Sequence, residues 1–385
     1  MIAAPVFVPL KHRQRLKTRQ WQQQRLVYQV ADAGSWVPAK LPPGSALTIR
    51  RDAGLGDCLM IACAIAALKQ QRPDLRISFA MPREYTELLS RFEGIDRALG
   101  LEDATGYPQS ESGQPLIELS NYAERHPQAN ETDRFTLFAQ ALGVPAGKLP
   151  AYNPTRADQR AADEFLEGWR VGHDPKGDSA QATVEAPSQT RSPKPDRGGR
   201  SRLAICVRGK YPHRSWLIPR ALQLAARLLD EGLDVILFDA EERPLYADWI
   251  DDAIRQASLD DVVRQASRLS GSNGTGRLLR AFGLPLPTVA AILSRCRAAV
   301  TPDTGFLHLC GCLRVPFVGI FGAIAPHLRT CLYENHIDLI ADDVPCAPCF
   351  EIPRHVACKL QCLQGIDVEM VYRGLNELLG RSLFS

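Results

Sequence analysis

The chain has 385 residues, too many for one hydrophobic core, which indicates two domains. Its 45% hydrophobic and 23% charged residues are typical of a globular protein, and a net charge of +3 gives no overall signature of nucleic-acid binding. The longest apolar run, Met60–Leu68, is too short to span a bilayer, and the apolar Ile2–Leu10 precedes the basic residues instead of following them, unlike a signal peptide. We therefore expect a cytoplasmic protein whose 11 cysteines are mostly reduced.

Residues 1–45 form a basic extension. Six basic residues precede Asp32, the first acidic one: Lys11, Arg13, Arg15, Lys17, Arg19 and Arg25. One interpretation is a solvated extension. The other is attraction to an acidic acceptor or to an anionic membrane, which would hold the protein peripherally at the inner membrane.

The first globular unit is predicted over residues 46–170 and begins with strands and helices in alternation. The pattern predicts strands at Ala46–Arg50 and Arg76–Ala80, each followed by a helix, at Cys58–Gln70 and Glu84–Phe92. This order implies a parallel sheet with right-handed crossovers. Further on, the sequence predicts a strand at Leu116–Leu119 and helices at Thr132–Leu142 and Arg156–Trp169.

The turn after the first of these strands carries Gly54, Gly56 and Asp57. The two glycines let the backbone turn sharply and approach a ligand closely. Asp57 follows the carboxyl end of a strand, where ligands bind in open α/β sheets. On position alone, however, a carboxylate here is more simply a cap of the following helix.

Residues 171–200 are rich in proline and glycine and almost free of large apolar residues, which predicts a flexible linker. A second α/β unit is then predicted over residues 201–345. Its expected strands are Leu203–Val207, Val235–Phe238, Ala298–Thr301 and Val315–Phe321, and its expected helices are Arg220–Glu231, Leu286–Arg295 and Phe306–Leu313.

Two turns of this second unit could bind an anion. The first is a long basic turn with Arg208, Lys210 and Arg214, which suits a diphosphate but is equally consistent with a solvated loop. The second is the turn that opens the helix Phe306–Leu313. There Asp303 or Thr304 can cap the helix, Gly305 begins it with free backbone N–H groups, and His308 lies one turn in.

A cluster of four cysteines follows in residues 346–365. Cys346 and Cys349 form a CxxC pair, and Cys358 and Cys362 come within the next thirteen residues. This spacing predicts a structural four-thiolate site for zinc or iron, against the alternative of four free cysteines in a loop. The other seven cysteines are expected in the core. Residues 366–385 hold the last predicted helix, Val368–Leu379, capped by Asp367.

Taken in order, these motifs resemble glycosyltransferase family 9, the heptosyltransferases of lipopolysaccharide synthesis and their relatives. The resemblance runs from Ala46 to the C-terminal helix. It rests on four stretches: Gly54-Leu55-Gly56-Asp57, Arg214-Ser215-Trp216, Asp303-Thr304-Gly305 with Leu307-His308, and Val318–Gly322. The basic extension and the linker have no counterpart in the family pattern, and Asp239 stands where the family usually has glycine.

The resemblance implies a GT-B fold, in which two Rossmann-like domains face each other across a cleft. It implies an inverting transfer without a catalytic metal, with a nucleotide-sugar donor, usually ADP-heptose, on the C-terminal domain and the acceptor on the N-terminal one. By the same resemblance Asp57 is the general base and Arg214 contacts the donor diphosphate, joined by Arg208 and Lys210. Asp303, Thr304, Gly305 and His308 form the donor-binding turn, and some relatives hold iron at four cysteines.

We therefore expect an inverting glycosyltransferase that acts on a glycan or a protein and binds no nucleic acid. A base on the acceptor side and cations at the leaving diphosphate are what such a reaction needs. The alternative is a non-catalytic binding or assembly protein of the same fold, which would use the cysteine segment and the basic extension for its partners.

Overall fold

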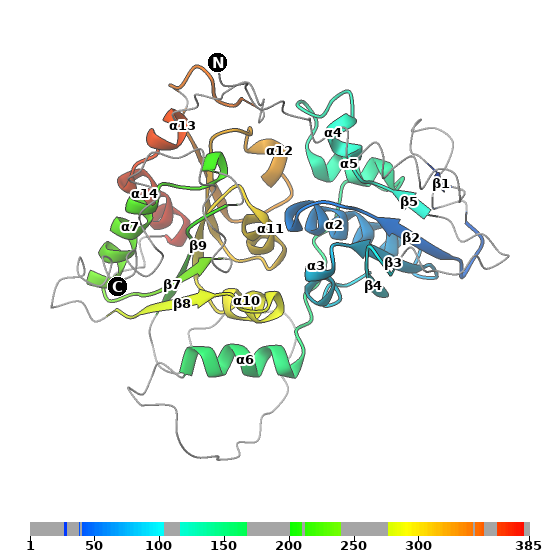
Figure 1. Cartoon of the computed structure of the whole chain (residues 1–385), viewed down its shortest axis with the longest axis horizontal. Coiled ribbons are helices and arrows are strands. Elements are labelled where there is room, and N and C mark those ends of the chain that lie inside the picture. The colour runs from blue at the N-terminus through cyan, green and yellow to red at the C-terminus, as the bar shows by residue number, and fades with distance from the viewer. Residues whose placement is uncertain are drawn as a thin grey trace, which may run out of the picture.

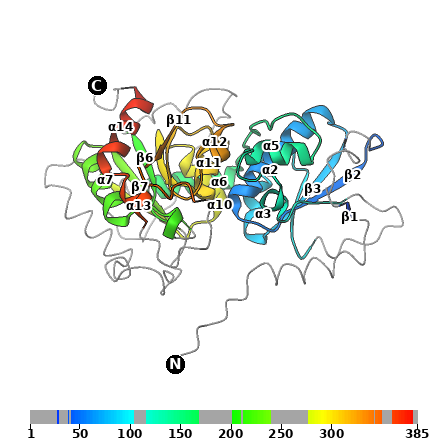
Figure 2. The ribbon, with the colours of Figure 1, turned by 90° about the horizontal axis from the view of Figure 1, so that it is seen from above.

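A computed structural model describes residues 27–28, 38, 41–103, 116–167, 201–209, 212–239, 276–341, 343–349 and 360–380. In this part of the chain two sheets of parallel strands lie side by side, each covered by helices (Figures 1 and 2). The predicted α/β class with two Rossmann-like domains is therefore confirmed. The predicted linker and most of the basic extension fall outside the described residues.

The first sheet has five parallel strands in the order β1-β5-β2-β3-β4. They are β1 (Val27–Tyr28), β2 (Ala46–Arg50), β3 (Arg76–Met81), β4 (Arg97–Gly100) and β5 (Leu116–Glu118). The strands β2, β3 and β5 coincide closely with the predicted ones, whereas β4 was not predicted because its sequence, RALG, carries no β-branched residue. Since β1 pairs with β5, the sheet includes two residues of the stretch interpreted as an extension.

Four helices belong to this domain: α2 (Leu55–Gln71), α3 (Arg83–Leu89), α4 (Tyr122–Arg125) and α5 (Arg134–Ala141). The helix α2 starts three residues earlier than predicted, and every residue from Cys58 to Leu68 is buried. A helix that is apolar all round must be covered on all sides. It is covered here because α2 contacts α5 of its own domain and α11 of the other.

The second sheet has six parallel strands in the order β11-β10-β9-β6-β7-β8, which is the doubly wound Rossmann order. They are β6 (Arg202–Cys206), β7 (Asp234–Asp239), β8 (Leu278–Phe282), β9 (Ala298–Pro302), β10 (Phe317–Phe321) and β11 (His336–Ile340). The edge strands β8 and β11 were not predicted. The order reverses between β6 and β9, so the carboxyl ends of these two strands mark the topological switch point.

The helices that cover this sheet are α7 (Ile218–Asp230), α10 (Leu286–Leu293), α11 (Gly305–Cys312), α12 (His327–Thr330), α13 (Gln361–Gln364) and α14 (Val368–Leu379), and a short 3-10 turn spans Pro212–Arg214. As predicted, Asp367 caps α14 by accepting a hydrogen bond from the Met370 N–H at 2.8 Å. No helix among the described residues combines the length and the apolar character that a membrane crossing requires.

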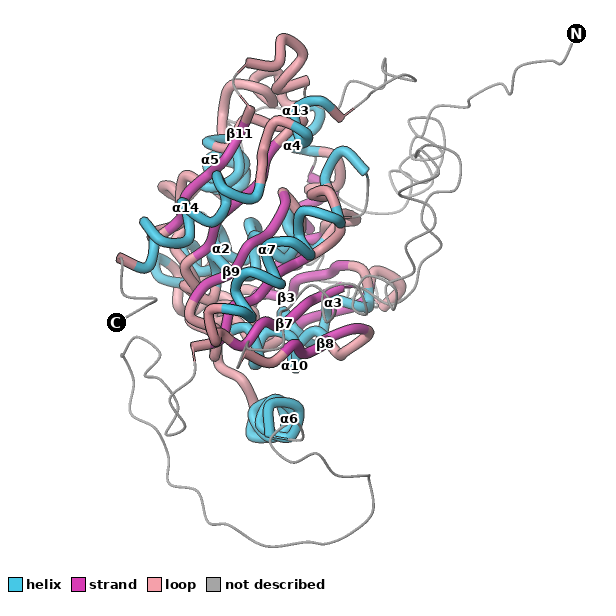
Figure 3. Tube along the Cα trace, turned by 90° about the vertical axis from the view of Figure 1, so that its left-hand side faces the viewer, coloured by secondary structure: helices cyan, strands magenta, loops and turns pink. Residues whose placement is uncertain are grey.

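One helix crosses between the domains. The sequence places α6 (Arg156–Glu167) at the end of the first unit, but α6 lies along α10 of the second domain (Figures 1 and 3). Arg295 holds α6 in this position through its Nη2, which forms an ion pair with the Asp163 Oδ1 at 2.9 Å and donates a hydrogen bond to the Gln159 carbonyl oxygen at 3.2 Å. The predicted boundary at residue 170 therefore does not separate the two packing units.

The two domains share one apolar core. A single buried cluster runs from the first sheet through α2 and α5 to α10 and α11, and a second one fills the far face of the second sheet under α7 and α14. At the boundary the Cys63 Sγ of α2 and the Cys312 Sγ of α11 lie 3.9 Å apart. Six of the seven cysteines expected in the core are buried, and the prediction is wrong for Cys331, which is exposed.

Candidate active site

The two glycine turns singled out in the sequence meet at the boundary between the domains. A Cβ added to Gly56 would lie 2.5 Å from the His308 Cδ2, and one added to Gly305 would lie 2.8 Å from the Leu55 Cβ. The first turn of α2 therefore rests directly on the first turn of α11. Since each helix start carries a partial positive charge from its free N–H groups, this junction attracts anions.

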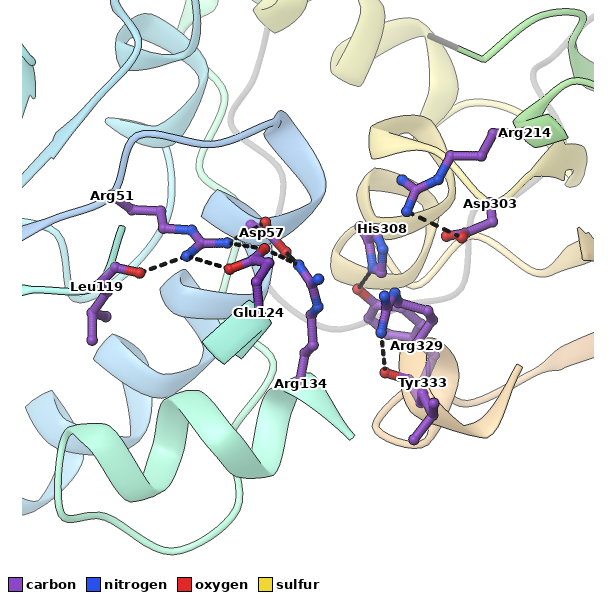
Figure 4. A network of polar contacts seen from close by, with 11 residues as sticks. Arg51, Asp57, Leu119, Glu124, Arg134, Arg214, Asp303, His308, Arg329 and Tyr333 are labelled. Atoms are coloured by element: carbon purple, nitrogen blue, oxygen red, sulfur yellow. Dashed lines mark hydrogen bonds and ion pairs between the residues drawn. The ribbon is translucent and has the colours of Figure 1, made fainter. Parts of the chain in front are cut away.

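Asp57 lies in the first turn of α2 and binds two arginines (Figure 4). Its Oδ2 accepts a hydrogen bond from the Arg51 Nη2 at 2.6 Å, and its Oδ1 accepts one from the Arg134 Nη1. Glu124 joins the same cluster, with its Oε1 2.8 Å from the Arg51 Nη2 and 3.1 Å from the Arg134 Nη1. Arg51 also donates to the Leu119 carbonyl oxygen at 2.5 Å, which links the carboxyl ends of β2 and β5.

This cluster keeps Asp57 ionised. Burial by itself raises the pKa of the Asp57 carboxyl, but the positive charges of Arg134 and Arg51 outweigh it and hold that pKa well below its usual range. The helix-cap interpretation, favoured from position alone, is wrong. The α2 cap is Gly54, which makes no side-chain hydrogen bond, and the Asp57 oxygens point to guanidinium groups.

Three residues of this cluster were missed in the sequence: Arg51, Glu124 and Arg134. Arg51 is next to a strand end, which is a signal for a site. Glu124 and Arg134 stand on α4 and α5, 67 and 77 residues after Asp57. Nothing in their local sequence reveals that the fold returns them to Asp57.

Across the boundary, Asp303 lies buried at the carboxyl end of β9 with 4% of its surface exposed. Its Oδ2 lies 3.9 Å from the Arg214 Nη2 and accepts no hydrogen bond within the described part of the chain. Burial by itself raises the pKa of the Asp303 carboxyl. The positive charges of Arg214 and Arg329 outweigh this effect and lower the pKa below its usual value, so the carboxyl is ionised. Of the two predicted caps for α11, Thr304 is the one used, with its Oγ1 3.2 Å from the Phe306 N.

His308 reaches the junction from inside the second domain. Its ring lies against Gly56, and its Nδ1 is 2.9 Å from the hydroxyl oxygen of Tyr333. Burial lowers the pKa of His308 to about 4, so the imidazole is neutral at pH 7. It is therefore placed to share a hydrogen bond with a ligand rather than to supply a positive charge.

The arginines of the basic turn after β6 interact with different carboxylates. The Arg208 Nε donates to the Asp239 Oδ2 at 2.5 Å, which directs this guanidinium towards β7. Arg214 faces Asp303 instead. The turn is closed by a hydrogen bond from the Gly209 N–H to the Ser215 Oγ at 2.9 Å. Lys210 lies outside the described residues, so Arg214 is the cation of this turn that the structure places at the junction.

The cysteine segment is described only in part. Cys346 is exposed, Cys349 is half-buried and Cys362 is buried, while Cys358 falls outside the described residues. In the described ranges, no three side chains of histidine, cysteine, aspartate or glutamate are grouped as metal ligands. Two of the predicted ligands nevertheless reach one loop: the Cys362 Sγ lies beside Gly322, and Cys349 packs against the apolar cluster of Ala323 and Ile324.

Comparisons with known proteins agree with this geometry. The model of glycosyltransferase family 9 (heptosyltransferase) matches residues 95–360. A lipooligosaccharide heptosyltransferase 2 from Haemophilus influenzae is 22% identical over 298 residues, which cover 71% of this chain and 82% of that protein.

Solved structures share the fold. A glycosyltransferase of family 9 from Veillonella parvula superposes with a TM-score of 0.62 at 14% identity, covering 88% of this chain and 98% of that one. The ADP-heptose lipopolysaccharide heptosyltransferase II of E. coli gives 0.59 at 15% identity, covering 87% and 99%. TibC of E. coli, an iron-containing dodecameric glycosyltransferase, gives 0.59 at 14% identity, covering 89% and 78%. These likenesses confirm the predicted GT-B architecture.

Proposed function

Because the chain belongs to glycosyltransferase family 9, we propose that it transfers a heptose from ADP-heptose to a hydroxyl group of a lipopolysaccharide-type glycan or of a protein, with inversion. The printed name of the Haemophilus relative supports the heptose, and a TibC structure in complex with ADP-D-beta-D-heptose supports the donor. Membership of a glycosyltransferase family sets aside the alternative of a non-catalytic binding protein.

The observation that carries this proposal is the contact between the start of α2, which carries Asp57, and the start of α11. An ionised carboxylate on the first domain lies across the boundary from a helix start, Asp303 and Arg214 on the second. In an inverting transfer the acceptor oxygen attacks the sugar from the face opposite the leaving diphosphate. A proton acceptor and an anion site are therefore needed on opposite sides of the sugar.

In this mechanism Asp57 takes the proton of the acceptor hydroxyl. Its lowered pKa makes it a weak base, so it acts late, when the acceptor oxygen has bonded to the sugar and become acidic. The charge on the departing diphosphate is stabilised by Arg214 and the backbone N–H groups at Gly305. The mechanism proposed here uses no catalytic metal. A cytoplasmic location of the protein, with residues 1–45 in peripheral contact with the inner membrane, remains a prediction.

Replacing Arg214 with alanine should weaken the binding of ADP by about 1.5–3 kcal/mol, the free energy of a hydrogen bond to a charged group. Isothermal calorimetry on the folded variant measures this directly. Arg227→Gln is the matched control, because Arg227 is a half-exposed arginine of the same domain that pairs with Glu369 away from the junction. Equal ADP affinity in wild type and Arg214→Ala would place the diphosphate elsewhere.

We also propose that Cys346, Cys349, Cys358 and Cys362 hold one structural zinc or iron ion. The supporting observation is that Cys349 and Cys362 both contact the loop of residues 322–324. Four thiolates fill a tetrahedral shell and leave no position for a substrate, so the ion would brace this loop after β10 rather than take part in the transfer.

Elemental analysis of protein purified without added metal should find about one equivalent of zinc or iron, since a four-thiolate site binds such ions tightly. Removing the ion with a chelator should lower the melting temperature. Cys331 is an exposed cysteine outside the segment, so the control variant Cys331→Ser should keep the metal content of wild type. Folded, active protein without either metal would contradict the proposal.

A further inference from the structure

Arg329, on the short helix α12, is a buried cation that forms no ion pair with a carboxylate of the described residues. Only 5% of its surface is exposed, and the one hydrogen bond that its side chain makes within the described residues runs from its Nη1 to the Leu328 carbonyl oxygen at 3.2 Å. The buried guanidinium of Arg51 is different, because it binds both Asp57 and Glu124. A buried charge without a partner costs several kcal/mol, so such a residue calls for an explanation.

Its surroundings are positive. Burial and then the nearby charge of Arg134 lower the pKa of Arg329 to about 10. Arg329 belongs to the second domain and Arg134 to the first, and Figure 4 shows the two side chains next to each other beside His308. Asp303 and Asp57 act on Arg329 only through space. The junction therefore brings like charges together from both domains.

Among the described residues, the charges of the side chains that interact at the junction do not balance. Four guanidinium groups, those of Arg51, Arg134, Arg214 and Arg329, stand among three carboxylates, those of Asp57, Glu124 and Asp303. His308 is neutral at pH 7, and the starts of α2 and α11 add further positive potential. An anionic ligand would supply the missing negative charge.

We propose that Arg329 binds the diphosphate of the nucleotide-sugar donor and stabilises the charge that develops on it during transfer. The inference rests on the proposed function. As the bond between the sugar C1 and the β-phosphate oxygen breaks, its electron pair stays on that oxygen, while the acceptor oxygen bonds to C1 and gives its proton to Asp57. A guanidinium can donate two parallel hydrogen bonds to such a phosphate.

The diphosphate fits better here than an anionic group of the acceptor. Arg329 stands on the same domain as Arg214 and the α11 start, and the charges of Arg214 and Arg329 both act on Asp303. Arg134, by contrast, is already bound to Asp57 and Glu124 on the acceptor side. Among the described residues, Arg329 is therefore a buried cation without an ion pair on the domain that is expected to hold the leaving group.

The test measures the binding of inorganic pyrophosphate by calorimetry to wild type, Arg329→Gln, Arg329→Lys and the control Arg373→Gln. Arg373 is an exposed arginine on α14, far from the junction. Arg329→Gln should weaken pyrophosphate binding about 10- to 100-fold, as expected for lost hydrogen bonds to a charged group, and Arg329→Lys should recover part of the affinity. Arg373→Gln should bind as wild type does.

Stability separates this role from a structural one. Removal of a buried cation that lacks a carboxylate should leave the melting temperature of Arg329→Gln without ligand unchanged or higher. A structural role predicts a lower melting temperature and unchanged affinity in the folded variant. Pyrophosphate should also raise the melting temperature of wild type more than that of Arg329→Gln.

Pyrophosphate carries neither nucleobase nor sugar, so the result is independent of which donor is used. If wild type consumes no nucleotide sugar, the proposed function fails. If wild type is active but Arg329→Gln binds pyrophosphate equally well, the assignment of Arg329 is overturned. The assignment is also overturned if wild type does not bind pyrophosphate. It is overturned as well if Arg329→Gln changes only the KM of the acceptor, because Arg329 would then bind an anionic group of the acceptor.

Discussion

Asp57→Asn should lower kcat about 10²- to 10⁴-fold, the usual contribution of a general base. The amide has the size of the carboxylate but cannot accept the acceptor proton. The affinity for ADP should stay close to that of wild type, because Asp57 stands on the first domain and the donor is expected on the second. Single-turnover kinetics and calorimetry, both well below the melting temperature, provide the two measurements.

The control for this variant comes from the same cluster. Asp57→Asn also leaves Arg51 and Arg134 with less negative charge, which could disturb the site without any role in proton transfer. Glu124→Gln removes a carboxylate from the same two arginines, but Glu124 is 40% exposed and is not the proposed base. We expect Glu124→Gln to lose less than about tenfold in kcat. Equal losses in both variants would reduce Asp57 to a positioning residue.

Gly56→Ala should reduce activity about 100-fold, whereas Gly54→Ala should behave as wild type. The new methyl group at position 56 would lie 2.5 Å from the His308 ring, which Tyr333 holds in place, so α2 and α11 must move apart. At Gly54 a Cβ meets nothing within 4 Å, and the backbone φ of −69° suits any residue.

The two glycine variants are measured side by side, by kcat and by melting temperature. Gly56→Ala should also lose about 1–3 kcal/mol of stability from overpacking. Similar activity in both variants would mean that the contact between the two helix starts is not needed for the reaction.

Most of the fold could be predicted because its signals are local. The β2-α2-β3 pattern, the β9-α11-β10 stretch and the Asp367 cap each lie within a few tens of residues, and each was found nearly at its observed bounds. The edge strands β4 and β8 carry no β-branched residue, and β11 is only partly buried along its whole length, so their sequences carried no clear strand signal. The position of α6 on α10 is a contact between domains, which periodicity does not contain.

In the candidate site, too, the residues with a local sequence signal were predicted and those brought in from distant segments were not. Turns at strand ends identified Asp57, Gly56, Asp303 and Gly305, since the carboxyl edge of a parallel sheet is where ligands bind. The charges that set their behaviour come from elsewhere. Arg134 and Arg329 lie on helices of different domains, in segments without a motif, and only the folded chain brings them to Asp57 and Asp303. The paired state of Arg208 with Asp239 was likewise invisible in the sequence.

The proposed activity of the protein is the transfer of a sugar from a nucleoside-diphosphate sugar to an acceptor hydroxyl group. The most direct test incubates it with a panel of nucleotide sugars, together with a core glycan lacking heptose and a protein extract, and follows donor and products by mass spectrometry. We predict that ADP-heptose is consumed, that ADP is released, and that one acceptor gains the mass of a heptose residue. If the folded protein consumes no nucleotide sugar of the panel with either acceptor, it does not have the proposed activity.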